Sequence, residues 1–466
     1  MMTLQQAHDW VAPGQLSAAL VGNGQTRIQR VHTDTRTLQK GDFFVALKGE
    51  NFDANDFLTH AESSGATAAI AHHGLVQAGL PGLEVGDSKL ALAQLAAGWR
   101  SQFDLPLIAV TGSNGKTTVT QMIASILRAW KMEDAFSTEG NFNNDIGVPL
   151  TLLRLKPTHQ VGVVELGMNH PGEIAYLAAL TRPAIALVNN AQREHLEFMA
   201  TVEAVALENG SVIDALDAQG VAVFPADDVY TATWRKIAGT RKVRTFALEG
   251  LADVTADARW VGNSWQVKAA TPSGPVEFTL AIAGRHNVKN ALAATACALV
   301  AGVPLASIAT GLSAFVPVKG RSRAVQVTVQ GRLLNLVDDT YNANPDSMRA
   351  AIDVLAELPG PRLLVMGDMG EVGNQGPQFH EEAGHLARTC GIEKLFTLGA
   401  QSARAASSFG LGLHFNDVDA LNAAVLAELP QLGSVLVKGS RFMKMERVVQ
   451  AIAATQSPHP GAPHAA

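Results

Sequence analysis

A glycine-rich segment at residues 111–118, with the sequence TGSNGKTT, has the residue types of a nucleotide phosphate site. Its glycines let backbone N–H groups approach phosphate oxygens, and the N-terminus of a following helix attracts an anion. Lys116 would neutralise the β- and γ-phosphates, and the Thr117 hydroxyl would bind Mg²⁺. The strict phosphate-loop pattern is not met, because Val110 stands where that pattern has its first glycine. The alternative interpretation is a glycine turn beside a chance lysine.

An acid and a histidine follow two other apolar runs. Glu165 ends the strand-like run of VGVVELG, and His195 lies shortly after AIALVNN, in NAQREHLEF. If these runs are strands of the same parallel sheet as residues 107–110, both side chains lie at its carboxyl edge, where ligands bind. A carboxylate at that edge can hold Mg²⁺. Taken singly, either residue is more often a solvated surface group, so their shared position is what favours a metal site.

Two asparagine-containing segments each allow two interpretations. Asn141, Asn143 and Asn144 in STEGNFNNDIGVPL are either turn residues or part of the lining of a cleft. Asn287 and Asn290 in GRHNVKNALAA either cap a helix or line its start near an adenine. The residue types leave both alternatives open. The chain has no guanine-specific N-K-x-D motif and no transporter-type L-S-G-G-Q motif, so nucleotide binding alone does not define the function.

The order of the motifs is more specific than any one of them. The chain contains, in this order, TGSNGKTT, TEGNFNNDIGVPL, VVELGMNHPGEI, NNAQREHLE, GRHNVKNALAA, DDTYNANPDSM and LVKGSR. With these motifs it resembles the Mur ligase family, the cytoplasmic ATP-dependent amide ligases of peptidoglycan synthesis, over nearly its whole length. ELGMNHPGEI, DDTYNANPDSM and MGDMGEVG favour the member that joins D-alanyl-D-alanine to UDP-N-acetylmuramoyl-tripeptide through an acyl phosphate.

The resemblance implies ATP and Mg²⁺ as cofactors, and the UDP-linked tripeptide and the dipeptide as substrates. Two other functions remain as alternatives. One is a related ligase that extends folate with glutamate, against which DDTYNANPDSM and the N-terminal region argue. The other is a phosphate-loop NTPase that acts as a switch or an assembly module, which would turn over ATP without an acceptor.

The resemblance also implies roles for individual residues. Lys116, Arg321 and His195 would be catalytic, with Arg321 reaching the γ-phosphate after closure of the third domain. The metal ligands would be Thr117, Glu165 and His195. The residues expected to bind ATP are Gly112, Ser113, Asn114, Gly115, Lys116, Thr117, Thr118, Asn287 at the adenine and Asp338 at the ribose. Those expected to hold the UDP part of the substrate are Thr33, Asp34, Thr35, Arg36, Lys48 and Asn51.

The sequence departs from the family pattern at three places. Thr35 replaces the more usual serine and keeps the hydroxyl, and residues 53–55 read Asp-Ala-Asn where Asp-Gly-His is usual. Related ligases carry a carbamylated lysine that assists a second Mg²⁺, and the matching position here is Asn209, in VALENG. We expect either another acid, with Glu208 the nearest candidate, or water to complete that metal shell.

Alternating strand-like and helical runs predict an α/β protein of three domains. Residues 1–82 would form a small α/β domain that binds the UDP-substrate, and 83–315 a central phosphate-loop ATPase domain with a parallel sheet. Residues 316–455 would form a C-terminal Rossmann-like ligase domain, followed by a disordered tail at 456–466. Strands are expected at 27–31, 43–47, 67–71, 107–110, 161–164, 185–188 and 221–224, a β-rich stretch at 254–282, and helices at 201–216 and 288–301.

Composition limits the partners and the compartment. The 466 residues carry 36 Lys and Arg against 42 Asp and Glu, a net charge of −6, which argues against nucleic acid as the partner. The only cysteines, Cys297 and Cys390, exclude a disulfide framework. No apolar run reaches the roughly 18 residues of a membrane helix, and the N-terminus lacks signal-peptide features. We therefore expect a cytoplasmic protein without membrane insertion, with a monomer as the default state.

Overall fold

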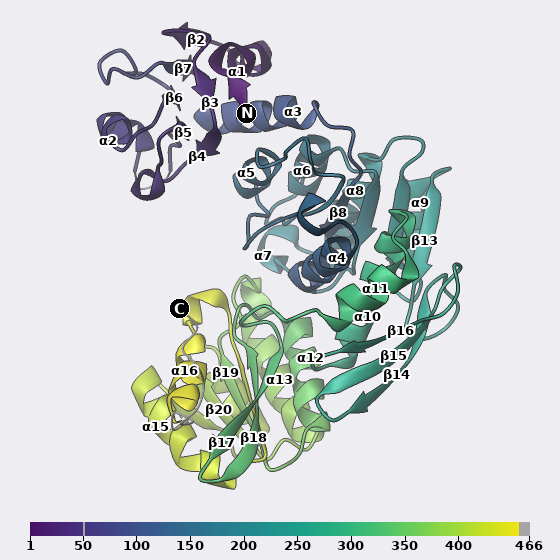
Figure 1. Ribbon diagram of the computed structural model, residues 1–466. Coiled ribbons are helices and arrows are strands. Elements are labelled where there is room, and N and C mark those ends of the chain that lie inside the picture. Colours follow the sequence, from purple (N-terminus) through teal and green to yellow (C-terminus); the bar gives the residue numbers. More distant parts are fainter. Residues whose placement is uncertain (50–51, 456–466) are drawn as a thin grey trace.

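The computed structural model describes residues 1–49 and 52–455, which form three successive α/β units (Figure 1). The predicted α/β class with three domains is confirmed. The predicted tail at 456–466 lies outside the described residues. Among the helices that the structure describes, none combines the length and the apolar character needed to cross a membrane.

The first unit is built on a five-stranded sheet with the order β2-β7-β6-β5-β4. Only the edge strand β2 runs antiparallel to its neighbour. The predicted strand at 27–31 is divided, because β3 (Arg27–Ile28) pairs with β1 (Met2–Thr3) while β4 (Arg30–His32) joins the main sheet. The other elements of the unit are α1 (Leu4–Val11), β2 (Ala18–Val21), β5 (Asp42–Val45), α2 (Leu58–Ser63), β6 (Ala68–Ala71) and β7 (Gly82–Val85).

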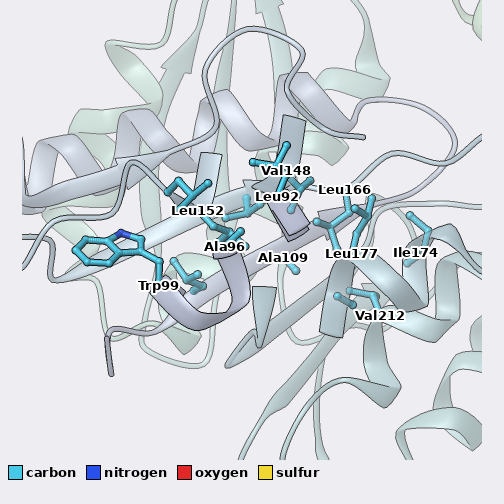
Figure 2. Close-up of a cluster of buried hydrophobic side chains, with 14 of the residues drawn as sticks. Leu92, Ala96, Trp99, Ala109, Val148, Leu152, Leu166, Ile174, Leu177 and Val212 are labelled. Atoms are coloured by element: carbon cyan, nitrogen blue, oxygen red, sulfur yellow. The ribbon is translucent and has the colours of Figure 1, made fainter. Parts of the chain in front are cut away.

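The helix α3 (Ser88–Arg100) connects the first unit to the second. The domain limit predicted after residue 82 falls inside β7, so the first sheet extends to Val85. Figure 2 shows Leu92, Ala96 and Trp99 of α3 among side chains of α5 (Gly147–Leu152), α6 (Glu173–Thr181) and their surroundings. One apolar core therefore continues from the N-terminal sheet through α3 into the central unit. Burial of apolar surface in this shared core is the main force that holds the two units together.

The central sheet has six strands, all parallel, in the order β13-β12-β11-β8-β10-β9. Strands of this kind are buried on both faces and read as continuous apolar runs, which is why the sequence revealed them. The carboxyl ends of β8, β10 and β11 lie side by side and carry the site. The bounds are β8 (Leu107–Thr111), β9 (Ala135–Ser137), β10 (Val161–Glu165), β11 (Ile185–Val188), β12 (Val221–Pro225) and β13 (Lys242–Phe246).

Helices cover both faces of the central sheet. On one face, α4 (Lys116–Lys131) packs with α10 (Arg285–Val300) and α11 (Leu305–Ser313) in a second core. The remaining helices are α7 (Leu196–Met199), α8 (Val202–Asp214) and α9 (Thr231–Ala238). The predicted β-rich stretch is an antiparallel sheet of β14 (Thr255–Val261), β15 (Ser264–Ala270) and β16 (Val276–Leu280), which packs on the same core.

The third unit is a six-stranded sheet in the order β17-β18-β22-β19-β20-β21, parallel except for the edge pair β17–β18. Its strands are β17 (Arg323–Val329), β18 (Arg332–Asp339), β19 (Arg362–Gly367), β20 (Lys394–Leu398), β21 (Leu413–Phe415) and β22 (Ser434–Lys438). Its helices are α12 (Pro345–Glu357), α13 (Gly376–Thr389), α14 (Ala403–Phe409), α15 (Val418–Glu428) and α16 (Glu446–Ala454).

Candidate nucleotide and metal site

A cavity of about 990 Å³ lies between the central and C-terminal units. One wall consists of the phosphate loop with the segments after β10 and β11 and the start of α10. The opposite wall consists of residues 320–322, 339–347 and 438–442. The carboxyl ends of two sheets therefore face the same space, as expected for ligand sites in parallel α/β proteins.

The phosphate loop needs both of its glycines. Gly112 and Gly115 have φ values of +132° and +81°, where an L side chain is strained. A Cβ on Gly115 would lie 2.7 Å from the side-chain oxygen of Asn290. Asn190 Oδ1 accepts a hydrogen bond from the Asn114 backbone N–H at 2.8 Å and so fixes the tip of the loop. The strand before and the helix after the loop match the predicted phosphate site, although Val110 replaces the first glycine.

Lys116 folds back over the loop. Its ammonium group donates to the carbonyl oxygens of Gly112 at 2.6 Å and Ser113 at 3.1 Å, and to Glu194 Oε1 at 2.7 Å. The lysine side chain is only 14% exposed. The cation is thus held at the N-terminus of α4, where an anion would meet both the lysine and the free backbone N–H groups.

Thr117 and Glu165 meet at the floor of the cavity. The Thr117 hydroxyl donates to Glu165 Oε1 at 3.0 Å, and the Asn143 amide donates to the same oxygen at 2.8 Å. The strand register places Glu165 opposite Val110 on the neighbouring strand. Glu165 is 1% exposed, and its second oxygen has no hydrogen-bond partner in the structure. A buried, half-satisfied carboxylate beside a hydroxyl is a donor set that suits Mg²⁺.

His195 lies between the two walls. Its backbone is left-handed, with φ of +49°, at the start of α7. The imidazole Nδ1 is 2.7 Å from Glu371 Oε2 of the C-terminal unit, and Nε2 is 3.6 Å from Glu194 Oε1. The close contact with His195 lowers the pKa of Glu371. Among the described residues, His195 and Glu165 are not part of any group of three or more His, Cys, Asp or Glu side chains arranged as a complete metal site.

The asparagines fit both interpretations. Asn143 contacts Glu165 and Asn144 Oδ1 accepts from the Gly147 backbone N–H at 2.8 Å just before α5, and both lie with Asn141 in the lining of the cavity. Asn287 donates to the Ala283 carbonyl at 2.7 Å and accepts from Asn290 at 2.9 Å. Both of the latter side chains are buried and fasten the start of α10, and both also line the cavity.

Arg321 lies on the opposite wall, with its guanidinium carbon 4.0 Å from the centre of the Tyr341 ring. Its neighbour Asp338 is not among the cavity-lining residues. Asp338 is 4% exposed, and its oxygens accept from the Gly320 backbone N–H at 3.1 Å and the Thr340 hydroxyl at 2.6 Å. Asp338 therefore holds the turn that carries Arg321, while the next residue, Asp339, lines the cavity, and the ribose contact expected of Asp338 stays a prediction.

The expected UDP-binding residues lie on the first unit and outside this cavity. Asp34 caps a short turn and accepts from the exposed Arg36 guanidinium, which lowers the pKa of Asp34 to about 2. The Asp53 carboxylate is 2.9 Å from His72 Nε2. Thr33, Thr35 and Lys48 belong to the same unit, and Asn51 lies outside the described residues.

Asn209, at the position of the missing lysine, and Glu208, the candidate acid beside it, both make contacts within the fold. Asn209 is 1% exposed, and its side-chain oxygen accepts from the Thr111 hydroxyl at 2.6 Å, beneath the phosphate loop. Glu208 points away from the cavity and accepts from the backbone N–H groups of Gly172 and Ile174, each at 2.8 Å, at the start of α6. The suggestion that Glu208 completes the metal shell is therefore wrong, because its carboxylate is committed to α6.

Three functional residues were missed by the sequence analysis, all in the segment that precedes His195. Gln192 contacts the phosphate loop through Ser113 and Asn114, and Glu194 contacts Lys116. Arg193 points the other way, toward the C-terminal unit. Their adjacency to His195 in NNAQREHLE is the sequence signal that could have identified them.

Arg193 connects the two walls of the cavity. It binds Asp346 of α12 through its backbone N–H at 2.8 Å and through two guanidinium nitrogens at 3.1 Å and 2.7 Å. A third nitrogen donates to Glu382 of α13 at 3.0 Å. Nearby, Asn344 at the N-cap of α12 donates to Asn114 of the phosphate loop at 2.9 Å. The C-terminal unit is thus attached directly to the phosphate loop.

Comparison with known proteins agrees with this architecture. Family models match three consecutive parts of the chain: "Mur ligase family, catalytic domain" at residues 27–100, "Mur ligase middle domain" at 110–298, and "Mur ligase, glutamate ligase domain" at 320–441. The chain belongs to the Mur ligase family and is an ATP-dependent peptide ligase.

Individual relatives cover almost the full chain. The UDP-N-acetylmuramoyl-tripeptide–D-alanyl-D-alanine ligase of Escherichia coli K12 is 41% identical over 97% of this chain and 98% of its own length. The enzyme of that name from Haemophilus influenzae is 39% identical over 94% and 96%. A crystal structure of MurF from Acinetobacter baumannii superposes with a TM-score of 0.88, at 35% identity over 97% of this chain and 99% of that one. MurF from Thermotoga maritima in complex with ADP gives 0.80, at 27% identity over 92% and 98%.

Proposed function

We propose that this chain joins D-alanyl-D-alanine to UDP-N-acetylmuramoyl-tripeptide at the expense of ATP, in the cytoplasm and as a monomer. The observation that carries the proposal is the two-walled cavity. It has Lys116, Thr117 and Glu165 on the phosphate-loop wall and Arg321 with Tyr341 on the C-terminal wall. The names of the relatives supply the substrates.

The phosphate-loop wall would bind the nucleotide. Backbone N–H groups from Gly112 to Thr118 and the Lys116 ammonium would hold the phosphates, and Asn287 would lie at the adenine. Thr117 and Glu165 fit Mg²⁺, since Glu165 has an oxygen without a partner, and His195 would contribute a nitrogen. When bound, the metal ion neutralises phosphate charge.

The reaction needs no protein nucleophile. The tripeptide carboxylate attacks the γ-phosphorus, so a P–O bond forms to the acyl oxygen and the bond to ADP breaks. The dipeptide amine then attacks the acyl carbon, loses a proton, and expels phosphate as the C–N bond forms. Lys116 and Arg321 would stabilise the charge that develops on the transferred group, and the closed cavity would hold the reactants in line.

The N-terminal unit would hold the UDP moiety with Thr33, Asp34, Thr35, Arg36, Lys48 and Asn51. In this unit Asn55 stands at the position of the usual histidine of the family pattern, and its amide contacts His73 and the His72 backbone N–H. The proposed uridine site lies outside the phosphate cavity, so the substrate must reach from one unit to the other.

Release of inorganic phosphate from ATP tests this proposal. We expect phosphate release to require both UDP-N-acetylmuramoyl-tripeptide and D-alanyl-D-alanine, with one amide bond formed for each phosphate. Turnover of ATP without an acceptor would instead support the NTPase alternative. Turnover with a folate and glutamate, but not with these substrates, would support the other ligase class.

A further inference from the structure

Glu194 lies among the groups that would handle the γ-phosphate. The residue is 9% exposed and lines the cavity. Its Oε1 accepts from the Lys116 ammonium at 2.7 Å and is 3.6 Å from His195 Nε2. Its Oε2 is buried and has no hydrogen-bond partner in the structure. The carboxylate therefore contacts the lysine through one oxygen, while its other oxygen is buried without a partner.

This arrangement is unfavourable unless a further cation binds. A buried carboxylate with an unsatisfied oxygen loses its hydration without full compensation. When phosphate draws Lys116 away, Glu194 would also lie beside a polyanion. A carboxylate and a phosphate group that lie close together repel each other strongly in a partly buried site. A divalent cation between carboxylate and phosphate removes both costs.

We propose that Glu194 is a Mg²⁺ ligand that pairs with His195 on the γ-phosphate side of the nucleotide. The inference rests on the proposed Mg²⁺-dependent function and adds a residue to it. Glu371 Oε2 lies 2.7 Å from Nδ1 of the same imidazole and Glu194 Oε1 lies 3.6 Å from Nε2, so the ring stands between the two carboxylates. An orienting partner of this kind is usual for histidine ligands. Neither Asn209 nor Glu208 offers a carboxylate to this space.

Binding of Mn²⁺ in the presence of AMPPCP, followed by electron paramagnetic resonance, tests the assignment without turnover. We expect Glu194→Gln to weaken the binding of Mn²⁺ by at least about tenfold relative to the wild type. Glu194→Asp, which keeps a carboxylate, should lie between the two. Glu208→Gln is the matched control, because its carboxylate lies at the start of α6 and outside the cavity, and it should bind Mn²⁺ as the wild type does.

In the absence of metal, Glu194 would only neutralise the charge of Lys116. Measuring the affinity for AMPPCP in EDTA isolates that effect from binding of the metal. If Glu194 is a metal ligand, Glu194→Gln should bind AMPPCP as tightly as the wild type or more tightly in EDTA, since Lys116 is freed, yet more weakly in Mg²⁺. A loss of affinity in Mg²⁺ that is absent in EDTA is the signature of the proposal. Tighter binding in both buffers, or unchanged Mn²⁺ affinity, would overturn it.

Two further results would also count against the assignment. An equal loss of Mn²⁺ in Glu208→Gln would show that the effect is not local to Glu194. If the wild type binds no Mn²⁺ beyond that held by free AMPPCP, the Mg²⁺ part of the proposed function fails, and the role of Glu194 fails with it. Circular dichroism of each variant establishes that it is folded.

Discussion

At the scale of single residues, the site depends on charges held in place by short contacts. Lys116 is bound by two loop carbonyls and by Glu194, and Arg321 stacks on Tyr341. Each side chain lies on a different wall of the cavity. Their substitutions should therefore affect different steps of the reaction.

Lys116→Ala should abolish phosphate release while leaving the binding of the UDP-substrate intact. The lysine lies at the phosphate loop, and the residues proposed to hold the uridine lie on the first unit, outside the cavity. Loss of one preorganised charge at a reacting centre costs about 10²- to 10³-fold in rate. Calorimetry with the UDP-substrate measures the second half of the prediction. Lys131→Ala, at the far end of α4, is the control; equal loss of substrate binding in Lys116→Ala would contradict the separation of sites.

Arg321→Ala should lower kcat far more than it changes the KM for ATP. The guanidinium lies across the cavity from the phosphate loop, so it would meet the γ-phosphate as charge develops rather than in the ground state. Steady-state kinetics at varied ATP measure both parameters. Arg321→Lys should restore little of the rate, because a lysine lacks the planar group that stacks on Tyr341. A rise in KM with unchanged kcat would exclude a transition-state role.

At the scale of elements, two adjacent residues of α8 contact two different neighbouring elements. Asn209 supports β8 through Thr111, while the preceding Glu208 caps the start of α6. Both residues are structural in this molecule. Because residue 209 is not a lysine, CO₂ cannot carbamylate it, and the reaction should not depend on CO₂ at this position.

Removal of bicarbonate and CO₂ from the buffer should leave the rate of ligation unchanged. An asparagine amide cannot carry the carbamate that a lysine amine takes up. Rates in degassed buffer with and without added bicarbonate measure this. A reversible loss of rate that bicarbonate restores would show that a lysine elsewhere in the chain is carbamylated.

Asn209→Lys should lower stability without raising activity. The position is buried beneath the phosphate loop, and a lysine there would place an unpaired charge in the core or displace α8 from β8. A loss of about 3–5 kcal/mol in the free energy of unfolding is expected for an uncompensated buried charge. Thermal unfolding monitored by circular dichroism gives the change, and an unaltered Tm would show that the site has room for the longer side chain.

At the scale of the whole molecule, Arg193 holds the C-terminal unit against the phosphate loop. Its contacts with Asp346 and Glu382 cross from the segment after β11 to α12 and α13. Because Asn344 of the same helix contacts Asn114, the position of the C-terminal unit is coupled to the loop. Opening the cavity must break this set of contacts.

Reversing the charge of Arg193 or of Asp346 should favour the open form, and reversing both should restore closure only in part, because Glu382 would then face an acid at position 193. For a partly exposed pair, a coupling free energy of about 1 kcal/mol is expected, or about fivefold in the closure equilibrium. Small-angle X-ray scattering measures the expansion. Arg404→Asp, which breaks an exposed pair with Glu381 inside the C-terminal unit, should leave the scattering unchanged. Failure of the double variant to recover would show that the contact does not control closure.

Much of the fold was predictable because its signals are local. Apolar runs such as 161–164 and 185–188 marked buried parallel strands, and the glycines and Lys116 marked the loop between β8 and α4. The strand at 27–31 was misread as one element, because its division depends on pairing with the distant Met2–Thr3. The domain limit after residue 82 stays a prediction, although it falls inside β7, a strand whose partners β2 and β6 come earlier in the chain.

By itself, the sequence determined which residue types stand at the ends of the strands, and hence the kind of ligand. Tertiary structure decided which of them meet. Glu165 meets Thr117 because β10 lies beside β8. The Asp338 carboxylate contacts the Gly320 backbone, and of these two neighbouring acids only Asp339 lines the cavity. The contact of Glu194 with Lys116 likewise depends on the fold, because the two residues lie far apart in the sequence. The reason is physical: side-chain chemistry is local, but burial, charge pairing and the direction of a side chain arise from contacts between segments far apart in the chain.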